Sequence, residues 1–230
     1  MIPVKVASNR RATPTTRILR LALDDVPFSY RAGQAAFLRV DSEPERTPYS
    51  IASSPEDTVR EGWLEFLVKT DQASRFGSRV GELRRGSTVL LHGPTGSFVF
   101  PDAPTERRFL FVAGGTGIAP LRSMLRHAIA VKVPGEKTLV YSARTPSEFA
   151  YLPELRALAT SGDITLKLTL TGIANRWRHS RGRAGSDILT PLVDEETLSF
   201  LCGPPAMIAE VRALLRSLGV PAMRIRSEEY

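Results

Sequence analysis

A glycine-rich segment at positions 114–120, with the sequence G-G-T-G-I-A-P, has residue types that could hold a phosphate group. Gly115 and Gly117 lack a Cβ atom, so the backbone can turn sharply and approach a ligand closely. Thr116 adds a hydroxyl group, and Pro120 suits the first turn of a helix. The start of that helix offers N–H groups and a positive dipole end, which favour a pyrophosphate. Because the spacing differs from G-x-G-x-x-G, a turn that only packs is an equal alternative.

Ser142 ends a predicted strand, 138–142, and Arg144 follows it. In dinucleotide-binding folds an acidic residue at the end of this strand holds the ribose 2′-hydroxyl, whereas an arginine suits a 2′-phosphate. The nearest acidic residue, Glu148, comes several positions later. Ser142 and Arg144 therefore favour NADPH over NADH, and a solvated arginine on a loop is the alternative.

Cys202 ends a further apolar run and is followed by Gly203, Pro204 and, after two more residues, Met207. A small polarizable cysteine at a strand end could pack against a nicotinamide ring. A buried core cysteine is the simpler interpretation of this position taken alone.

A fourth candidate lies in the first half of the chain, where Arg46, Thr47, Tyr49 and Ser50 stand close together. Tyrosine can stack on a flat heterocycle, a serine hydroxyl can bond a ring nitrogen, and arginine can pair with a phosphate. Without further support, an ordinary edge strand explains the same residues.

The elements that must position these residues fall into two groups. In about the first hundred residues, apolar and polar side chains alternate over short stretches that are separated by turn residues. This pattern indicates a small β-barrel. Strands and helices alternate from about position 108, which indicates βαβ units and a parallel sheet. We therefore predict two domains, 1–101 and 106–230, on either side of a Pro-rich segment. The predicted strands are 3–7, 17–23, 35–40, 49–52, 63–68, 88–91, 109–113, 138–142, 164–170 and 198–202, and the predicted helices are 120–130, 147–160, 186–193 and 205–218.

Composition excludes several classes of protein. No apolar run approaches the ~18 residues of a membrane span, and no signal-peptide core is present, so a cytoplasmic location is the simplest prediction. The single cysteine excludes an internal disulfide and a built-in [2Fe–2S] cluster, and the three histidines have no metal-ligand spacing, so no metal is predicted. The net charge of +7 could steer acidic partners, and a solvated basic surface is favoured over nucleic-acid binding.

Four motifs together resemble the ferredoxin–NADP reductase superfamily, in its bacterial FAD- and NAD(P)H-dependent branch. Segment 49–53, Y-S-I-A-S, looks like the flavin motif R-x-Y-S followed by I-A-S, and 93–98, G-P-T-G-S-F, looks like the family turn G-P-x-G-x-F. Segment 114–120 matches the NAD(P) turn G-G-T-G-I-A-P, and 202–207 matches C-G-P-P-x-M. The motifs occur in the family's order and cover nearly the whole chain.

The resemblance implies an antiparallel flavin-binding barrel followed by an α/β nucleotide-binding domain. It implies that Tyr49 flanks the isoalloxazine ring, that Ser50 lies near flavin N5, and that Cys202 sits beside the nicotinamide C4. Many members end in an aromatic residue that covers the flavin, with a carboxylate two positions earlier, which Tyr230 and Glu228 match. This ending favours FAD, with FMN as the alternative.

Two positions depart from the family pattern. The flavin-phosphate arginine usually stands two residues before the tyrosine, where this chain has Thr47, with Arg46 one residue further back. The family's G-x-x-S/T phosphate turn follows a Val-Lys strand end, here Val68 and Lys69. Its spacing does not fit cleanly, which leaves three candidates for the phosphate turn: Ser74, Gly77 and Ser78.

The predicted function is an FAD-dependent oxidoreductase that passes a hydride from NAD(P)H to FAD and electrons to a separate acceptor. A small acidic redox protein such as a ferredoxin is the expected partner, because a basic reductase would attract it. A flavin reductase that releases reduced flavin, or a flavin-binding regulatory subunit, are the alternatives. The oligomeric state is left open.

Overall fold

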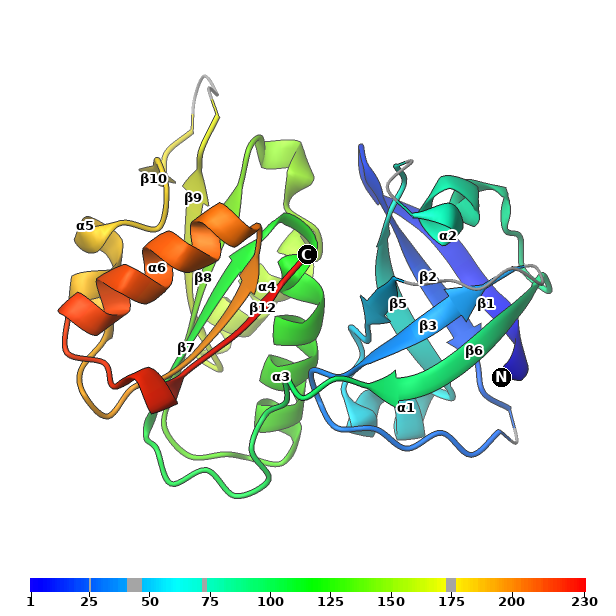
Figure 1. Ribbon diagram of the computed structural model, residues 1–230, viewed down its shortest axis with the longest axis horizontal. Coiled ribbons are helices and arrows are strands. Elements are labelled where there is room, and N and C mark those ends of the chain that lie inside the picture. The colour runs from blue at the N-terminus through cyan, green and yellow to red at the C-terminus, as the bar shows by residue number, and fades with distance from the viewer. Residues whose placement is uncertain (25, 41–46, 72–73, 173–176) are drawn as a thin grey trace. The chain divides into compact units, whose positions relative to one another are not determined.

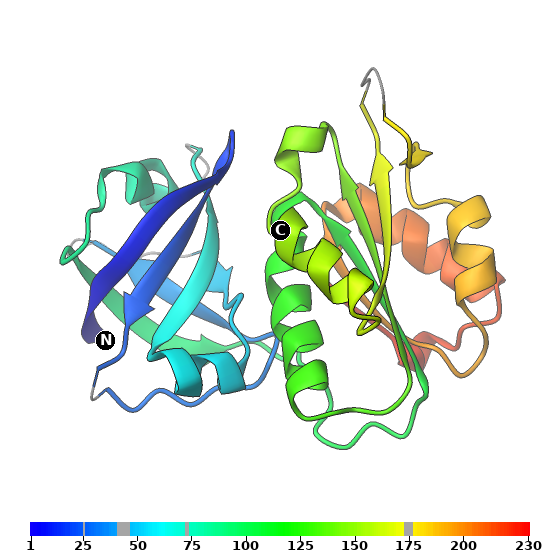
Figure 2. The same cartoon turned by 180° about the vertical axis from the view of Figure 1, so that it is seen from behind.

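The computed structural model describes residues 1–24, 26–40, 47–71, 74–172 and 177–230 (Figures 1 and 2). They form two compact units. Unit 1 comprises Met1–Phe100 together with Arg122–Val131, and unit 2 comprises Pro101–Leu121 together with Lys132–Tyr230.

Unit 1 is an antiparallel barrel of six strands. The edge strands of its sheet meet through a bridge between Ile51 and Phe66 and through the Ala52 N–H, which donates to the Glu65 carbonyl at 2.7 Å. This closure confirms the predicted barrel. The sheet order is β4-β3-β6-β1-β2-β5, with β1 (Ile2–Thr13), β2 (Thr16–Ala22), β3 (Ala35–Arg39), β4 (Pro48–Ser50), β5 (Trp63–Lys69) and β6 (Thr88–Thr95).

Alternating side chains fill the barrel. Leu19 and Leu21 of β2 point inward and are fully buried, as are Leu38, Phe66 and Leu91 from three other strands. This period of two follows from the opposite directions of successive side chains in a strand.

Two short helices of the barrel were not predicted. Helix α1 (Pro55–Glu61) begins with a capping box, in which Ser54 accepts the Asp57 N–H and the Asp57 carboxylate accepts the Ser54 N–H, and it ends at Gly62 with φ 77°. Helix α2 (Arg75–Arg79) runs directly into the 3₁₀ helix η1 (Val80–Glu82).

Unit 2 contains the predicted parallel sheet, which has six strands and helices on both faces. Helix α6 covers the face seen in Figure 1, and α4 covers the face seen in Figure 2. The sheet order is β10-β9-β8-β7-β11-β12, with β7 (Arg108–Gly114), β8 (Glu136–Ala143), β9 (Thr165–Leu170), β10 (Ser180–Arg181), β11 (Leu198–Gly203) and β12 (Ile225–Glu229). The helices in this part of the chain are α3 (Ile118–Ala130), α4 (Leu152–Thr160), α5 (Ser186–Leu189) and α6 (Pro205–Ser217). Helix α3 begins in unit 2, and its residues from Arg122 onward belong to unit 1.

The helices that follow β7 differ from the prediction in three places. Helix α3 begins two residues before the predicted start at Pro120. The helix predicted over 147–160 is shorter, because Tyr151 has φ 59°, and only a 3₁₀ turn (Pro146–Glu148) precedes it. Helix α5 ends at Leu189 and continues as a 3₁₀ turn (Thr190–Leu192) that contains Pro191. Strands β10 and β12 were not predicted.

Strand order reverses at β7, because β8 lies on one side of it and β11 on the other. Ligands of open α/β sheets bind at the carboxyl ends of the strands beside such a switch point. Among the described residues we find no helix with the length and apolarity of a membrane span and no cluster of three potential metal-binding side chains.

Candidate functional site

The glycine turn lies at the switch point and packs against the end of β11. It forms a 3₁₀ turn, Gly115–Gly117, between β7 and α3. A Cβ atom on Gly117 would overlap the carbonyl of Cys202, and Gly115 has φ 52°. The glycines at these two positions are therefore required by close packing and by a left-handed backbone.

Met207 fills the space next to this turn. A Cβ on Gly114 would lie 2.7 Å from the Met207 sulfur, and a Cβ on Gly203 would lie 2.5 Å from its methyl carbon. Pro204 stands just before α6 as its N-cap. The glycine turn at 114–120 and the C-G-P-P-A-M segment at 202–207 thus pack against each other at two neighbouring strand ends, which their order in the sequence could not establish.

Tyr141 supports the turn from β8 and was not recognised in the sequence. Its ring is fully buried, and its hydroxyl donates to the Gly115 carbonyl at 3.0 Å and accepts the Ala150 N–H at 3.2 Å. It resembles any other apolar position of a buried strand, so only its polar oxygen could have indicated this role.

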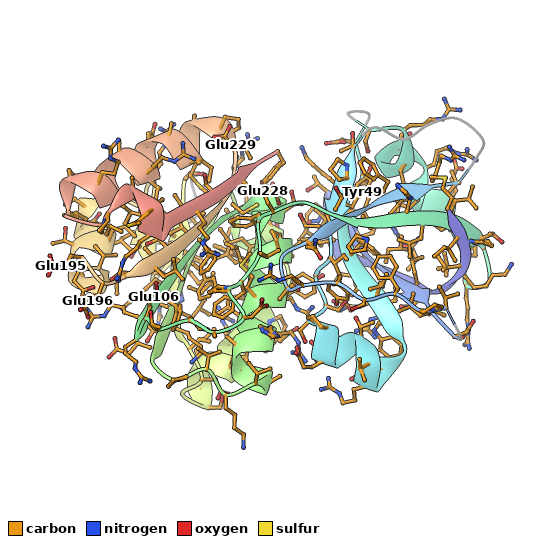
Figure 3. All side chains as sticks on the ribbon, turned by 60° about the horizontal axis from the view of Figure 1, so that its bottom comes forward. Tyr49, Glu106, Glu195, Glu196, Glu228 and Glu229 are labelled. Atoms are coloured by element: carbon orange, nitrogen blue, oxygen red, sulfur yellow. The ribbon has the colours of Figure 1, made fainter. Side chains whose placement is uncertain are left out.

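Tyr230 reaches the same turn from the C-terminus. Strand β12 pairs with β11 so that Glu228 stands opposite Cys202, and Figure 3 shows Glu228 and Glu229 on this strand. The Tyr230 hydroxyl donates to the Gly114 carbonyl at 2.6 Å, and the side chain is about half exposed. Its partial burial raises the pKa of Tyr230. The contact that we observe is with the glycine turn, and coverage of a flavin by this ring stays a prediction.

Cys202 is buried at the end of β11, with 2% of its surface exposed. Burial, and secondly the charge of Glu228, raise the pKa of its thiol well above the ordinary value. Cys202 therefore presents a neutral thiol at physiological pH.

Ser142 and Arg144 lie at the carboxyl end of β8. Ser142 pairs in register with Gly114 of the neighbouring strand and is buried, whereas Arg144 is exposed. The Glu148 carboxylate accepts the N–H groups of Arg144 and Thr145 at 3.1 and 3.2 Å. The acidic residue nearest to this strand end is thus engaged by backbone donors.

On the barrel, the structure brings Tyr49 and Ser74 together. Their hydroxyl oxygens lie 2.5 Å apart, and the Tyr49 ring packs on Phe76 of α2 with ring centroids 5.4 Å apart. Tyr49, labelled in Figure 3, and Ser50 are half-buried on β4. An aromatic ring whose hydroxyl meets the Ser74 hydroxyl, with Ser50 next to it in the strand, offers groups that suit a flat heterocycle carrying a phosphate.

The other barrel candidates differ in their surroundings. Ser74 caps α2 by accepting the Gly77 N–H at 2.9 Å, while the Ser78 hydroxyl donates to the Arg75 carbonyl at 2.8 Å. Of the three candidates for the phosphate turn, Ser74 thus bonds to Tyr49, Gly77 donates to Ser74, and Ser78 bonds to the backbone of its own helix. Val68 is buried, whereas Lys69 is exposed and forms an ion pair with Asp71 at 2.8 Å. Thr47 is exposed, and Arg46 lies outside the described residues.

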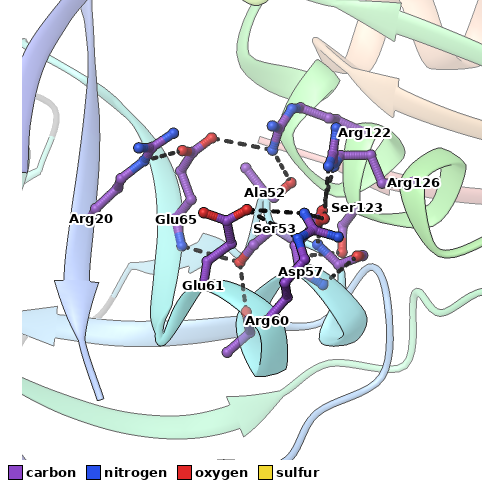
Figure 4. A network of polar contacts seen from close by, with 12 residues as sticks. Arg20, Ala52, Ser53, Asp57, Arg60, Glu61, Glu65, Arg122, Ser123 and Arg126 are labelled. Atoms are coloured by element: carbon purple, nitrogen blue, oxygen red, sulfur yellow. Dashed lines mark hydrogen bonds and ion pairs between the residues drawn. The ribbon is translucent and has the colours of Figure 1, made fainter. Parts of the chain in front are cut away.

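A buried polar network within unit 1 holds the segment that follows β4 (Figure 4). Arg122 of α3 donates to the Ala52 carbonyl at 2.6 Å and lies 3.1 Å from Glu65, and Ser123 donates to the Ser53 carbonyl at 2.6 Å. Glu65 also accepts a hydrogen bond from Arg20 at 2.6 Å. No motif indicated this network, because its members are scattered along the chain.

Asp57 joins the same helix to α1. Burial acts to raise the pKa of its carboxyl group, but hydrogen bonds and charge from Arg126, with further hydrogen bonds from Arg60 and Ser54, outweigh it. The pKa of Asp57 therefore lies well below its ordinary value.

Comparison with known proteins agrees with this geometry. Residues 3–100 match the family model "Oxidoreductase FAD-binding domain", and residues 111–213 match "Oxidoreductase NAD-binding domain". The chain is similar to ferredoxin–NADP reductase B of Sorangium cellulosum, with 32% identity over 90% of this chain and 88% of that protein. It is also similar to the glycine betaine monooxygenase reductase subunit of Pseudomonas aeruginosa, with 28% identity over 91% of this chain but only 58% of that protein.

A solved structure shows the same fold. The ferredoxin NADP⁺ reductase of Neisseria gonorrhoeae, crystallised with FAD and NADP, superposes with a TM-score of 0.83 over 99% of this chain and 98% of that chain, at 21% identity. This likeness confirms the expected two-part fold, and the two family models confirm the expected FAD and NAD(P) cofactors. The chain belongs to the ferredoxin–NADP reductase family of FAD- and NAD(P)-dependent oxidoreductases.

Proposed function

We propose that this protein is a reductase that takes a hydride from NAD(P)H and passes electrons through FAD to a separate, small acidic redox protein such as a ferredoxin. The observation that carries the proposal is the packing of the glycine turn against the Cys202 strand end at the switch point of the sheet. This arrangement supports a nicotinamide nucleotide in a chain whose first part is an FAD-binding domain.

The residues have separate proposed roles. Tyr49 flanks the flavin ring, Ser50 and Ser74 donate hydrogen bonds to it or its phosphate, and Cys202 offers a small neutral surface to the nicotinamide. Bound FAD supplies the link between hydride transfer from a nicotinamide and the one-electron chemistry of a redox protein. The remaining barrel candidates, Lys69, Gly77 and Ser78, stay assigned to the flavin phosphates as part of the proposal.

The nucleotide preference is proposed from the β8 strand end. Because backbone N–H groups engage the Glu148 carboxylate, Arg144 is the charged side chain that we assign to a 2′-phosphate, beside the hydroxyl of Ser142. NADPH is therefore the proposed donor. Residues 1–101 and 106–230 are the proposed flavin and nucleotide domains, and a cytoplasmic location stays a prediction from the sequence.

The test is an anaerobic visible spectrum of the purified protein, titrated with NADPH and then with NADH. We expect flavin bands that bleach faster with NADPH. A flavin that stays oxidised with both nucleotides would contradict the proposal and indicate a binding or regulatory role. A colourless protein that bleaches only added flavin would instead indicate a flavin reductase.

A further inference from the structure

The barrel unit has an arginine-lined cleft that none of the proposed cofactor roles uses. Its volume is about 620 Å³, and its walls come from β1, β2, η1 and the loop that follows η1. We call it the arginine cleft and define it by four of its lining residues, Asn9, Arg17, Arg84 and Arg85.

Asn9 fixes the cleft by bonding both of its walls. Its side-chain amide donates to the carbonyls of Val80 at 2.7 Å and Leu83 at 3.0 Å, and its side-chain oxygen accepts the Nε–H of Arg17 at 2.8 Å. The Arg17 Nη2 also donates to the Asn9 carbonyl at 3.2 Å. The guanidinium group of Arg17 is thus held at the cleft before any partner arrives.

The loop side of the cleft is ordered in the same way. The Arg84 Nη1 donates to the carbonyls of Gly81 at 2.9 Å and Leu83 at 3.2 Å, and its backbone N–H donates to the Ser87 hydroxyl at 3.0 Å. Arg84 and its neighbour Arg85 are both exposed.

Positive charge is concentrated at the cleft. Arg17 stands directly opposite Arg11 in the β1–β2 register, a pairing of like charges that destabilises a sheet. In the part of the chain that the structure describes, no carboxylate comes within 4 Å of the guanidinium groups of Arg17, Arg84 or Arg85. Glu82, the acidic residue of this loop, lies 3.6 Å from Arg79 instead.

We propose that the arginine cleft is the docking surface for carboxylate side chains of an acidic protein partner. A wide cleft with exposed arginine ends suits side chains projecting from another surface, and the guanidinium fork matches a carboxylate. The repulsion between Arg11 and Arg17 costs stability, and such a cost is typical of a surface that has a function.

The proposal rests on the proposed function, because it names where the acidic electron acceptor binds. The cleft is connected through the chain to the helix that contacts Tyr49. The loop that carries Arg84 follows η1, which continues α2, and α2 contributes Phe76 to the contact with Tyr49.

The experiment compares two double variants that lower the net charge equally. Arg84→Glu/Arg85→Glu reverses the charge of two arginines of the cleft. Arg156→Glu/Arg216→Glu, the control, reverses the charge of two exposed arginines on α4 and α6. Titration calorimetry at low salt measures binding of the oxidised protein to an acidic [2Fe–2S] ferredoxin. Reduction of menadione, a neutral quinone, by NADPH measures activity that needs no docking.

We expect the cleft variant to bind the ferredoxin about tenfold more weakly and the control variant to stay within about twofold, with menadione reduction unchanged in both. Arg85→Glu alone, which disturbs no hydrogen bond of the loop, gives a smaller loss in the same direction. Equal weakening in both double variants, or unchanged binding in the cleft variant, would overturn the proposal.

The two proposals fail in different ways. A wild-type protein that reduces menadione but binds no acidic ferredoxin overturns the docking surface and leaves the reductase. A protein whose flavin is not reduced by NADPH overturns the proposed function, while calorimetry on the oxidised protein still decides whether the cleft binds the ferredoxin.

Discussion

At the residue scale, Gly117 is the position where a single methyl group has the clearest predicted cost. In Gly117→Ala the new Cβ overlaps the Cys202 carbonyl, so we expect a loss of about 2 kcal/mol in the free energy of unfolding and a raised KM for NADPH. Gly81→Ala is the matched control, because a Cβ there has no neighbour within 4 Å. Denaturant unfolding and steady-state kinetics measure both effects. Equal stability of the two variants would contradict the close packing of the turn.

The neutral, buried thiol of Cys202 leads to a second prediction. Maleimides react with the thiolate, which burial and the charge of Glu228 disfavour here. We expect no labelling of the native protein within hours and complete labelling in denaturant, as measured by mass spectrometry. Rapid labelling of the native protein would show that the end of β11 opens.

Tyr230→Phe tests the hydrogen bond to the Gly114 carbonyl. If a bound nucleotide must displace the tyrosine hydroxyl from the glycine turn, removing that hydroxyl lowers the KM for NADPH by about threefold, as expected for one hydrogen bond of modest strength. Kinetics with a small acceptor measure the change. A KM that rises would mean that the hydroxyl assists binding and does not compete with it.

The positions of the glycine turn and the Cys202 segment at strand ends could be predicted from residue type alone. Glycine and proline restrict the backbone at such a position, and cysteine restricts the chemistry. Tyr141 and Arg122 could not be predicted, because their roles depend on one polar atom that meets a distant carbonyl.

At the scale of elements, the missed helices and strands have two different causes. The start of α1 has a readable signal, Ser54 followed by Pro55 and Asp57, which is typical of a helix N-terminus although no helix was predicted there. Strands β10 and β12 have polar, partly exposed sequences, and their pairing with β9 and β11 decides their conformation. Local sequence patterns cannot supply that pairing.

The contact between α1 and α3 predicts a specific dependence of stability on pH. The lowered pKa of Asp57 stabilises the fold fully above its unfolded pKa of about 4, and this contribution is lost as pH falls below that value. We expect Asp57→Asn to lower the free energy of unfolding by about 2 kcal/mol at pH 7 and to flatten its decline below pH 4. Urea unfolding at several pH values measures both.

Glu61→Gln, on the same helix, is the control for this prediction. Its exposed ion pair with Arg60 contributes little to stability, so we expect a change below about 0.5 kcal/mol and an unaltered acid profile. If the free energy of unfolding of Asp57→Asn falls with acid as steeply as that of the wild type, groups other than Asp57 cause the acid sensitivity.

At the scale of the whole molecule, the net charge of +7 predicts how the reductase responds to salt. Attraction of an acidic acceptor is screened as the Debye length shrinks from about 10 Å at 0.1 M to about 3 Å at 1 M salt. We expect kcat/KM for an acidic ferredoxin to fall by about tenfold over this range, whereas menadione reduction stays nearly constant. A parallel loss of both rates would indicate an effect of salt on the nucleotide or flavin site.

Helix α3 has a consequence for any attempt to recombine this protein. A chimaera joined in the Pro-rich segment 101–105 would exchange two sequence halves, yet residues 122–131 belong structurally to the barrel. A foreign second half would leave one oxygen of the buried Glu65 without the guanidinium of Arg122 and the Ser53 carbonyl without the Ser123 hydroxyl. A graft that keeps the barrel intact must therefore retain these helix positions, so the unit of exchange is discontinuous in the gene.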